Sequence, residues 1–195
     1  MFGQAGAFLL QTIEFVIVYP ALLRFFMQIF RAPARNPLSN FVIAITDFAV
    51  KPLRKLIPGV NGMDLASFIW AWLAEIILLF LFFSLAGANV FMGGPLTLPA
   101  IVFLAFVKLV KFSIYLLIFA VLVQAILSWT SPYHPLQPVF ASLTRPFLSP
   151  IQRIIPTLGG VDLSPLVLFV ICQLLLILPI NTLEAIAVRL IPISG

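Results

Sequence analysis

The sequence predicts an all-α membrane protein with four transmembrane helices in two tandem parallel repeats, each with an amphipathic, proline-bent cytoplasmic loop. Composition is the first observation behind this prediction. The chain of 195 residues is 63% hydrophobic and 9% charged, whereas soluble domains are roughly half apolar and about a quarter charged. The second observation is a pattern of residues that occurs twice, 98 positions apart. The third is the gathering of basic residues around two long loops.

Four stretches are apolar and long enough to cross a bilayer, which takes about 20 helical residues. They cover residues 7–30, 65–87, 104–129 and 165–188. The segment before the first stretch has no basic residue, and the stretch itself contains Glu14. Because a signal peptide has a basic start and a shorter apolar core, we expect this stretch to be a retained span.

Residues 36–68 align with residues 134–166 without a gap, and 9 of the 33 aligned positions are identical. Such self-similarity marks a structural unit that is used twice. The repeat motif comprises Pro37, Pro52, Pro58, Gly62 and Asp64 in the first copy and Pro135, Pro150, Pro156, Gly160 and Asp162 in the second. We expect a first repeat at 1–90 with its loop at 36–64, a linker at 91–99, and a second repeat at 100–195 with its loop at 134–162. Each repeat crosses the membrane twice, so both copies have the same orientation.

Each long loop carries apolar residues at the spacing of one helical face. In the first loop these are Leu38, Phe41, Val42, Ile45 and Phe48, with Ser39, Asn40, Thr46 and Asp47 opposite. In the second loop they are Leu136, Val139, Phe140, Leu143 and Phe147. Pro52 and Pro150 predict a second helical piece after a bend. We expect these helices to lie at the membrane interface with their apolar faces toward lipid or protein, and Asp64 and Asp162 to cap the spans that follow.

Basic residues flank the spans unequally, which predicts the orientation of the chain. Those in or beside the long loops are Arg24, Arg31, Arg35, Lys51, Arg54, Lys55, Arg145 and Arg153, against Lys108, Lys111 and Arg189 on the other side. The positive-inside rule therefore predicts both long loops in the cytoplasm and both termini outside. Lys108 and Lys111 fit this orientation poorly, and we expect them to shift the outer end of the third span toward residue 112 or to snorkel.

The two copies of the motif read PLRKLIPGVNGMDL at 52–65 and PIQRIIPTLGGVDL at 150–163. Together with Asn36-Pro37 and His134-Pro135, they resemble the YggT family of small bacterial and plastid membrane proteins, also called YlmG. The resemblance covers nearly the whole chain. The sequence departs from the family pattern twice: Gln152 stands where the first copy has Arg54, and residues 59–62 replace the usual glycine pair. The two loops therefore need not be equivalent in function.

The resemblance implies a four-span protein of the bacterial cytoplasmic, or inner, membrane without known catalysis. It links the family to osmotic-stress tolerance, to septum and cell-shape organisation, and, in plastid relatives, to cytochrome assembly and nucleoid distribution. These associations differ among members and select no single activity. The expected partners are the lipid bilayer, other membrane or division and assembly proteins, and further copies of this chain.

Glu14 and Glu75 fall inside predicted spans, where ionisable groups are costly and often functional. Each could fix helix packing by pairing with Arg24, Lys108 or Lys111, or with a neighbouring polar group such as Gln11, Gln124 or Gln173. Alternatively, Glu75 could handle a proton or cation. On the loops, the candidates for partner or lipid binding are Phe41, Arg54, Lys55, Phe140 and Arg153. Anionic head groups, an acidic protein surface and simple anchoring by positive charge are all compatible with these basic residues.

No catalytic constellation is present in the sequence, which has one histidine, one cysteine and no phosphate-binding or zinc motif. Because His134 aligns with Asn36, we expect it to bond the local backbone rather than a metal. We expect no enzyme activity, no metal, no cofactor and no nucleic-acid partner. The function predicted first is a non-enzymatic scaffold or assembly factor, and the alternative is a small ion or osmolyte transporter or channel component.

Overall fold

The computed structural model describes residues 2–57, 59, 63–88, 90, 94–131, 133–155 and 162–191, and every longer element within them is a helix. The first repeat contains α1 (Phe2–Ile29), α2 (Pro37–Leu56) and α3 (Leu65–Leu85). The second contains α4 (Thr97–Thr130), α5 (Gln137–Ile154) and a last long helix made of α6 (Ser164–Leu175), a π-helical turn (Leu176–Ile180) and α7 (Asn181–Arg189). The motif residues Pro58, Gly62, Pro156 and Gly160 lie outside the described residues.

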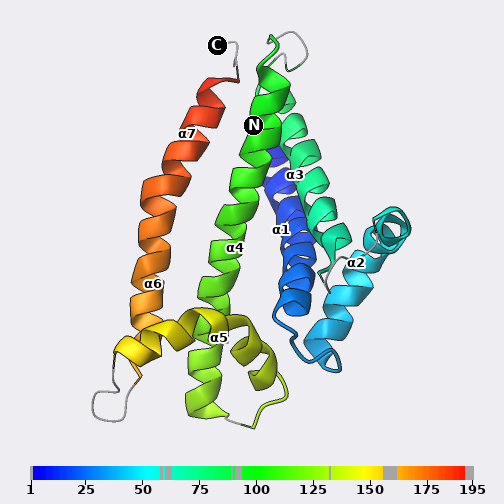
Figure 1. Cartoon of the computed structure of the whole chain (residues 1–195). Helices are drawn as coiled ribbons and strands as arrows, with labels where there is room; N and C mark the ends of the chain where they lie inside the picture. The colour runs from blue at the N-terminus through cyan, green and yellow to red at the C-terminus, as the bar shows by residue number, and fades with distance from the viewer. Residues whose placement is uncertain are drawn as a thin grey trace.

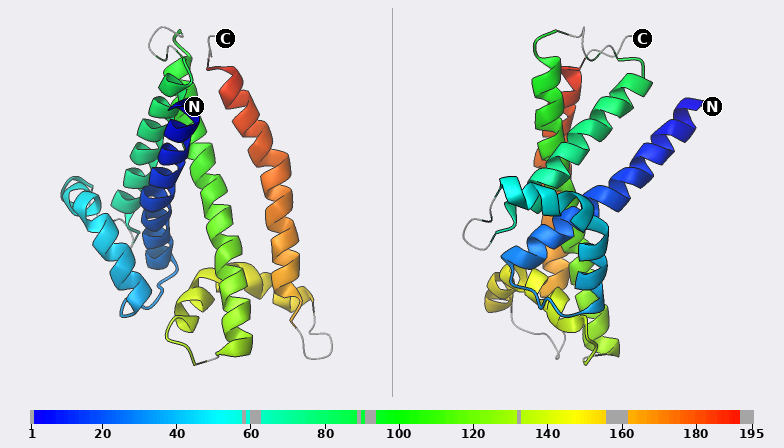
Figure 2. Two further views of the ribbon diagram at one scale, coloured as in Figure 1. Left: turned by 180° about the vertical axis from the view of Figure 1, so that it is seen from behind. Right: turned by 90° about the vertical axis from the view of Figure 1, so that its right-hand side faces the viewer.

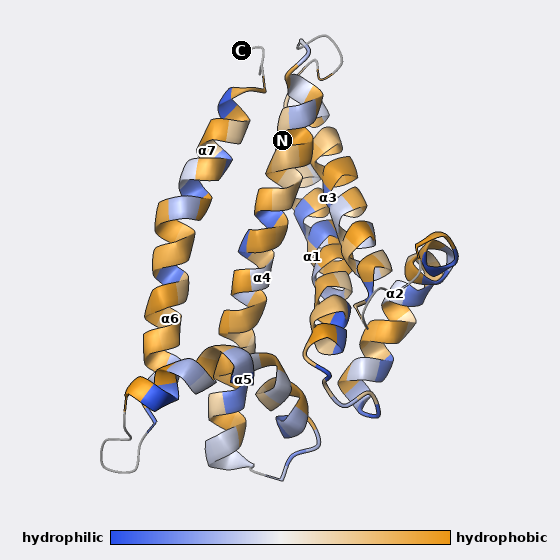
Figure 3. Ribbon diagram, viewed as in Figure 1, coloured by the Kyte–Doolittle hydropathy of each residue, from blue (hydrophilic) through white to orange (hydrophobic). Residues whose placement is uncertain are grey.

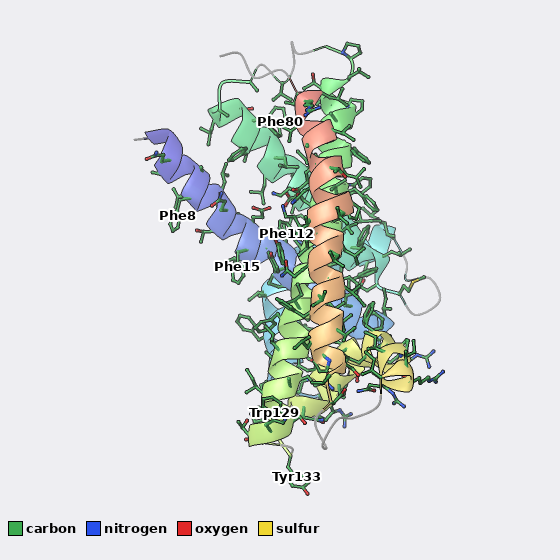
Figure 4. All side chains as sticks on the ribbon, turned by 90° about the vertical axis from the view of Figure 1, so that its left-hand side faces the viewer. Phe8, Phe15, Phe80, Phe112, Trp129 and Tyr133 are labelled. Carbon is green, nitrogen blue, oxygen red and sulfur yellow. The ribbon has the colours of Figure 1, made fainter. Side chains whose placement is uncertain are left out.

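Among the described residues, four helices are long and apolar enough to cross a membrane, which confirms the predicted all-α fold with four spans. In Figure 1 the two chain ends lie at one end of the bundle, and α5 lies across the other end. The spans are mostly apolar, with isolated polar turns in α4 and α7 (Figure 3). Phe8 and Phe15 point away from the other helices, whereas Phe112 points into the bundle (Figure 4). This exposed apolar surface is what lipid tails would cover.

The third span begins at Thr97 rather than near residue 104, because α4 is a single helix of 34 residues. Lys108 therefore lies a third of the way along the helix and not at its outer end. The fourth span is interrupted by the π-helical turn, which contains Pro179. Proline has no amide hydrogen to donate, and a helix commonly absorbs this loss by a local change of winding.

Each loop contains one continuous helix, and not the two pieces that the sequence predicted. Pro52 lies inside α2, and Pro146 and Pro150 lie inside α5. An internal proline removes one hydrogen bond and bends a helix, but the neighbouring bonds can carry the helix past it. The bend in α2 is visible in the two views of Figure 2.

Side chains at equivalent positions fix the start of both loop helices. The Ser39 amide donates to Asn36 Oδ1 at 2.8 Å, which caps α2. The Leu136 amide donates to His134 Nδ1 at 3.2 Å just before α5. His134 thus bonds the local backbone, as its alignment with Asn36 predicts.

The two repeats differ in how tightly their spans pack. Ala21, Ala71 and Ala74 are buried between α1 and α3, where small residues allow two helices to approach closely. By contrast α4 meets the last helix mainly along α7 and less along α6. The spans of the second repeat therefore pack closely at one end and leave more room between α4 and α6.

The apolar faces predicted for the loop helices have different outcomes. On α5 the prediction is confirmed, because Val139, Phe140 and Leu143 are buried against α1 and α4. On α2 the apolar face is divided: Phe41 and Phe48 are exposed, as side chains turned toward lipid or a partner would be, whereas Val42 is buried. Two residues of the polar side, Ser39 and Thr46, are also buried. The polar side of α2 faces the bundle because Arg24 of α1 bonds Thr46 and Asp47 there.

Candidate functional site

Arg24 is the α1 residue that holds α2. Its side chain is 8% exposed, and its guanidinium donates to Thr46 Oγ1 at 2.7 Å and to Asp47 Oδ1 at 2.9 Å. Asp47 also pairs with Lys51 at 2.7 Å, one helical turn further along α2. A buried arginine needs such partners, because an unpaired charge away from water is costly. The contacts of Arg24 therefore fix which side of α2 faces the bundle.

Asp64 joins the far end of α2 to the start of α3. Its carboxylate accepts hydrogen bonds from Arg54 Nε at 3.1 Å, from Arg54 Nη2, and from Ser67 Oγ at 2.5 Å. Arg24 Nε lies 3.5 Å from the same carboxylate. Asp64 occupies the cap position of α3 but makes no side-chain hydrogen bond to its amides, because these partners take both oxygens. We call Arg24, Thr46, Asp47, Arg54 and Asp64 the first clamp.

The second repeat builds the same two connections without a basic residue. Thr144, which aligns with Thr46, donates its hydroxyl to Gln124 Oε1 of α4. Gln152, which aligns with Arg54, donates to Asp162 at 2.8 Å. Asp162 also accepts the Ser164 amide at 2.9 Å at the start of α6, although the cap position itself is held by Leu163. We call Gln124, Thr144, Gln152 and Asp162 the second clamp.

The two clamps explain why the motif repeats a threonine and an aspartate, and why the change from Arg54 to Gln152 preserves the geometry. In both repeats the residue ten positions before the aspartate reaches it from the loop helix. In the first clamp arginines bond the carboxylates and Asp64 is buried, whereas in the second the donors are neutral and Asp162 is exposed. The first clamp should therefore hold its helix more strongly.

The carboxylates of the clamps have lowered pKa values. For Asp64, burial raises the pKa, but hydrogen bonds from Arg54 and Ser67 and the charges of Arg54 and Arg24 outweigh it, so the pKa lies below the ordinary 3.8. For Asp47, the hydrogen bond from Lys51 is the main cause of a lowered pKa. The pKa of Arg54 is raised, mainly by its hydrogen bond to Asp64.

These shifts predict how acid affects stability. A carboxyl whose pKa is lower in the folded state stabilises the fold above its unfolded pKa, and this contribution is lost as the pH falls through the folded pKa. We expect the difference in unfolding midpoint between wild type and Asp64→Asn to be constant from pH 7 to about 5 and to shrink below the ordinary 3.8. Thermal unfolding of the two purified proteins between pH 3 and 7 measures this. A difference that persists unchanged at pH 3 would contradict the assignment.

A second group of charges lies within the spans. Lys108 of α4 pairs with Glu14 of α1 and lies 2.6 Å from Glu75 Oε1 of α3. Glu75 is fully buried. Its two oxygens have no hydrogen-bond partner of suitable geometry, so the ion pair with Lys108 is their main compensation. We call Glu14, Glu75 and Lys108 the charge cluster.

The charge cluster borders a cavity of about 280 Å³ whose lining is mostly apolar but includes four charged side chains. Glu14 and Lys108 line it together with a second pair, in which Lys111 Nζ lies 2.7 Å from Glu184 of α7. Charged side chains from both repeats thus meet at α4. The two lysines neither end the third span nor snorkel, because each finds a carboxylate on a neighbouring helix.

The residues predicted to bind a partner or lipid differ in how exposed they are. Phe41, Lys55 and Arg153 are exposed, whereas Phe140 is 5% exposed and packs against Phe119, so it is not available to a partner. Arg54 is partly exposed but engaged by Asp64. Among the described residues, no group of three or more histidine, cysteine, aspartate or glutamate side chains is arranged to hold a metal.

Sequence reasoning missed the role of Arg24, which it treated mainly as a basic flank of the first span. The sequence did contain a signal for this role, because Thr46 and Asp47 lie on the polar side of the first loop helix, opposite its apolar face. A buried arginine at the end of one span makes a neighbouring acidic residue a candidate partner, but only the fold of α2 against α1 shows which one.

The fold and these polar contacts define a four-span helical membrane protein built from a duplicated unit. A sequence model of the CCB3/YggT family matches residues 3–85 and 103–183, one segment in each repeat. The chain belongs to this family.

Several bacterial relatives share most of the chain. It is 38% identical to a Vibrio alginolyticus protein over 84% of this chain and 87% of the relative. It is 35% identical to a Pseudomonas aeruginosa protein over 94% and 92% of the two chains. It is 33% identical to the YggT protein of Escherichia coli K12 over 95% and 94%. No solved structure matches the chain.

Proposed function

We propose that the protein is a non-enzymatic scaffold or assembly factor of the bacterial cytoplasmic membrane, in which α2 positions another membrane protein. The first clamp is the observation that carries this proposal. It fixes α2 at two points, at its middle to α1 through Arg24 and near its C-terminal end to α3 through Asp64. A helix that is already ordered loses little entropy when a partner binds.

The outward side of α2 supplies the docking surface. Phe41 and Phe48 are 61% and 67% exposed and lie two helical turns apart. Lys51 and Lys55 are exposed on the same helix, toward its C-terminal end. This combination fits a membrane protein with an apolar helix surface and acidic residues at the interface, because apolar contact and opposite charge would act together. The family resemblance links such assembly to envelope and division processes and to osmotic-stress tolerance.

Photo-crosslinking in living cells tests the scaffold. Probes at Asn40 and Lys55 on α2 are compared with a probe at Gln152 on α5, followed by mass spectrometry of the adducts. We expect the two α2 probes to capture the same defined membrane protein and the α5 probe to capture less of it. Capture of lipid or of the protein's own copies alone would contradict a scaffold.

A second function, proton or cation handling, is favoured by one observation. Two carboxylates, Glu14 and Glu75, share one lysine within the spans, and the cluster borders a cavity where both repeats meet. Sites between repeats are common in transporters. Flux through liposomes containing Glu75→Gln tests this function, with Glu184→Gln as the matched control. A transporter should lose flux in the first variant, whereas a scaffold shows no specific flux in either variant or in wild type.

A further inference from the structure

An apolar cavity of about 280 Å³ lies where α4, α5 and α6 of the second repeat meet α1. Phe26 and Phe30 of α1, Leu117 of α4, Phe147 of α5 and Leu168 of α6 are among its walls. The hydroxyl in the lining, on Ser113, donates to Leu109 O at 2.7 Å within its own helix. The cavity therefore offers few polar partners to water, and a hydrocarbon chain suits it better.

A basic hollow adjoins this cavity on one side of α5. Its lining includes Arg145, Arg153, Ser142, Ser149 and Phe30, and its volume is about 540 Å³. Phe30 borders both spaces, and its ring packs against Phe147 of the apolar cavity with centroids 5.7 Å apart. The two spaces thus meet at one aromatic side chain, with the basic one toward the loop and the apolar one toward the spans.

Neither arginine of the basic hollow is neutralised. Within the described part of the chain, Arg145 and Arg153 take part in no ion pair or side-chain hydrogen bond. The acidic residue of this loop, Asp162, is held by Gln152 at 2.8 Å and by the Ser164 amide at 2.9 Å. The arginines are eight residues apart, a little over two helical turns, and both line the same hollow beside α5.

The first repeat has different chemistry at the aligned positions. Arg145 stands where the first repeat has Asp47, whose carboxylate pairs with Arg24 and Lys51. Arg153 aligns with Lys55. The exchange of an acidic for a basic residue leaves two unmatched positive charges beside the cavity of the second repeat.

We propose that the second repeat binds one anionic phospholipid, with its phosphate head group at Arg145 and Arg153 and one acyl chain in the apolar cavity. The charge of the hollow selects a negative head group, and arginine offers paired donors to phosphate oxygens. The cavity beside it accepts the tail. This site is independent of the docking surface on α2.

Native mass spectrometry of the purified full chain tests the proposal. The protein is titrated with phosphatidylglycerol and phosphatidylcholine that have identical acyl chains. We expect one tightly bound phosphatidylglycerol, preferred roughly 30-fold, since each arginine near a membrane surface contributes about a fivefold effect. The double variant Arg145→Gln and Arg153→Gln should bind the two lipids about equally.

The matched control is Arg35→Gln with Lys55→Gln, which removes the same charge from the first repeat and should retain the preference. Leu117→Trp, which fills the cavity, should weaken binding of both lipids. Equal losses in the two charge variants would mean that total positive charge alone attracts lipid, and would overturn the site. A preference below threefold in the wild-type protein would also overturn it. So would a dimer that forms without bound lipid and is lost when the two arginines are replaced.

Discussion

Replacing Asp64 by asparagine is expected to destabilise the protein by about 3 kcal/mol, because it leaves positive charges of a largely buried network without their shared carboxylate. Asp64 is 2% exposed and connects Arg54 to Ser67, with Arg24 close by. Arg24 keeps Asp47, and the partly exposed Arg54 can turn toward water, so the loss should fall at the low end of the range for broken buried pairs. In thermal unfolding this corresponds to a decrease of roughly 6–12 °C.

Asp162→Asn is the matched control for this prediction. The residue occupies the same position in the second repeat, but it is exposed and its side-chain partner Gln152 is neutral. We expect a loss below about 1 kcal/mol. Equal destabilisation by the two substitutions would contradict this account, because it would show that the first clamp is no stronger than the second.

The second large effect is expected for Lys108→Met, which should cost about 3–5 kcal/mol. The substitution leaves Glu14 and Glu75 close together within the spans without the ammonium group that both contact. Two adjacent carboxylates in a region of low dielectric repel each other and are poorly solvated. The free energy of unfolding in mixed micelles with increasing denaturing detergent measures the loss.

Two further variants separate the charge cluster from general packing. Lys111→Met removes a lysine from the same helix, but its partner Glu184 is 20% exposed, so the loss should be smaller. Adding Glu14→Gln and Glu75→Gln to Lys108→Met removes all the charges of the cluster and should restore most of the stability. No recovery in this triple variant would mean that shape, and not charge, explains the effect of Lys108.

The sequence predicted the large features of the fold because they follow from composition and repetition. A run of apolar residues is sufficient to place a span, and the spacing of Pro52 and Pro150 is sufficient to align the repeats. The paths of the loop helices were less predictable. Phe41 and Val139 occupy aligned positions in similar patterns, yet one is exposed and the other fully buried.

The polar contacts depend on interhelical geometry that no local pattern contains. Glu14 and Lys108 are 94 residues apart, and several basic residues were candidate partners for each acidic one. Arg24 selects Thr46 and Asp47 only because α2 folds back along α1. The equal spacing of Arg54 from Asp64 and of Gln152 from Asp162 was visible as part of the repeat. Only the fold shows that each pair connects two helices.

The most direct test of the central claim combines the first clamp with the docking surface. A photo-crosslinking probe at Asn40 is placed in wild type, Asp64→Asn and Asp162→Asn, at equal levels of membrane insertion. If the first clamp holds α2 for a partner, Asp64→Asn should lose most of the adduct formed by wild type, and Asp162→Asn should retain it. An adduct of equal yield in all three proteins would contradict the account.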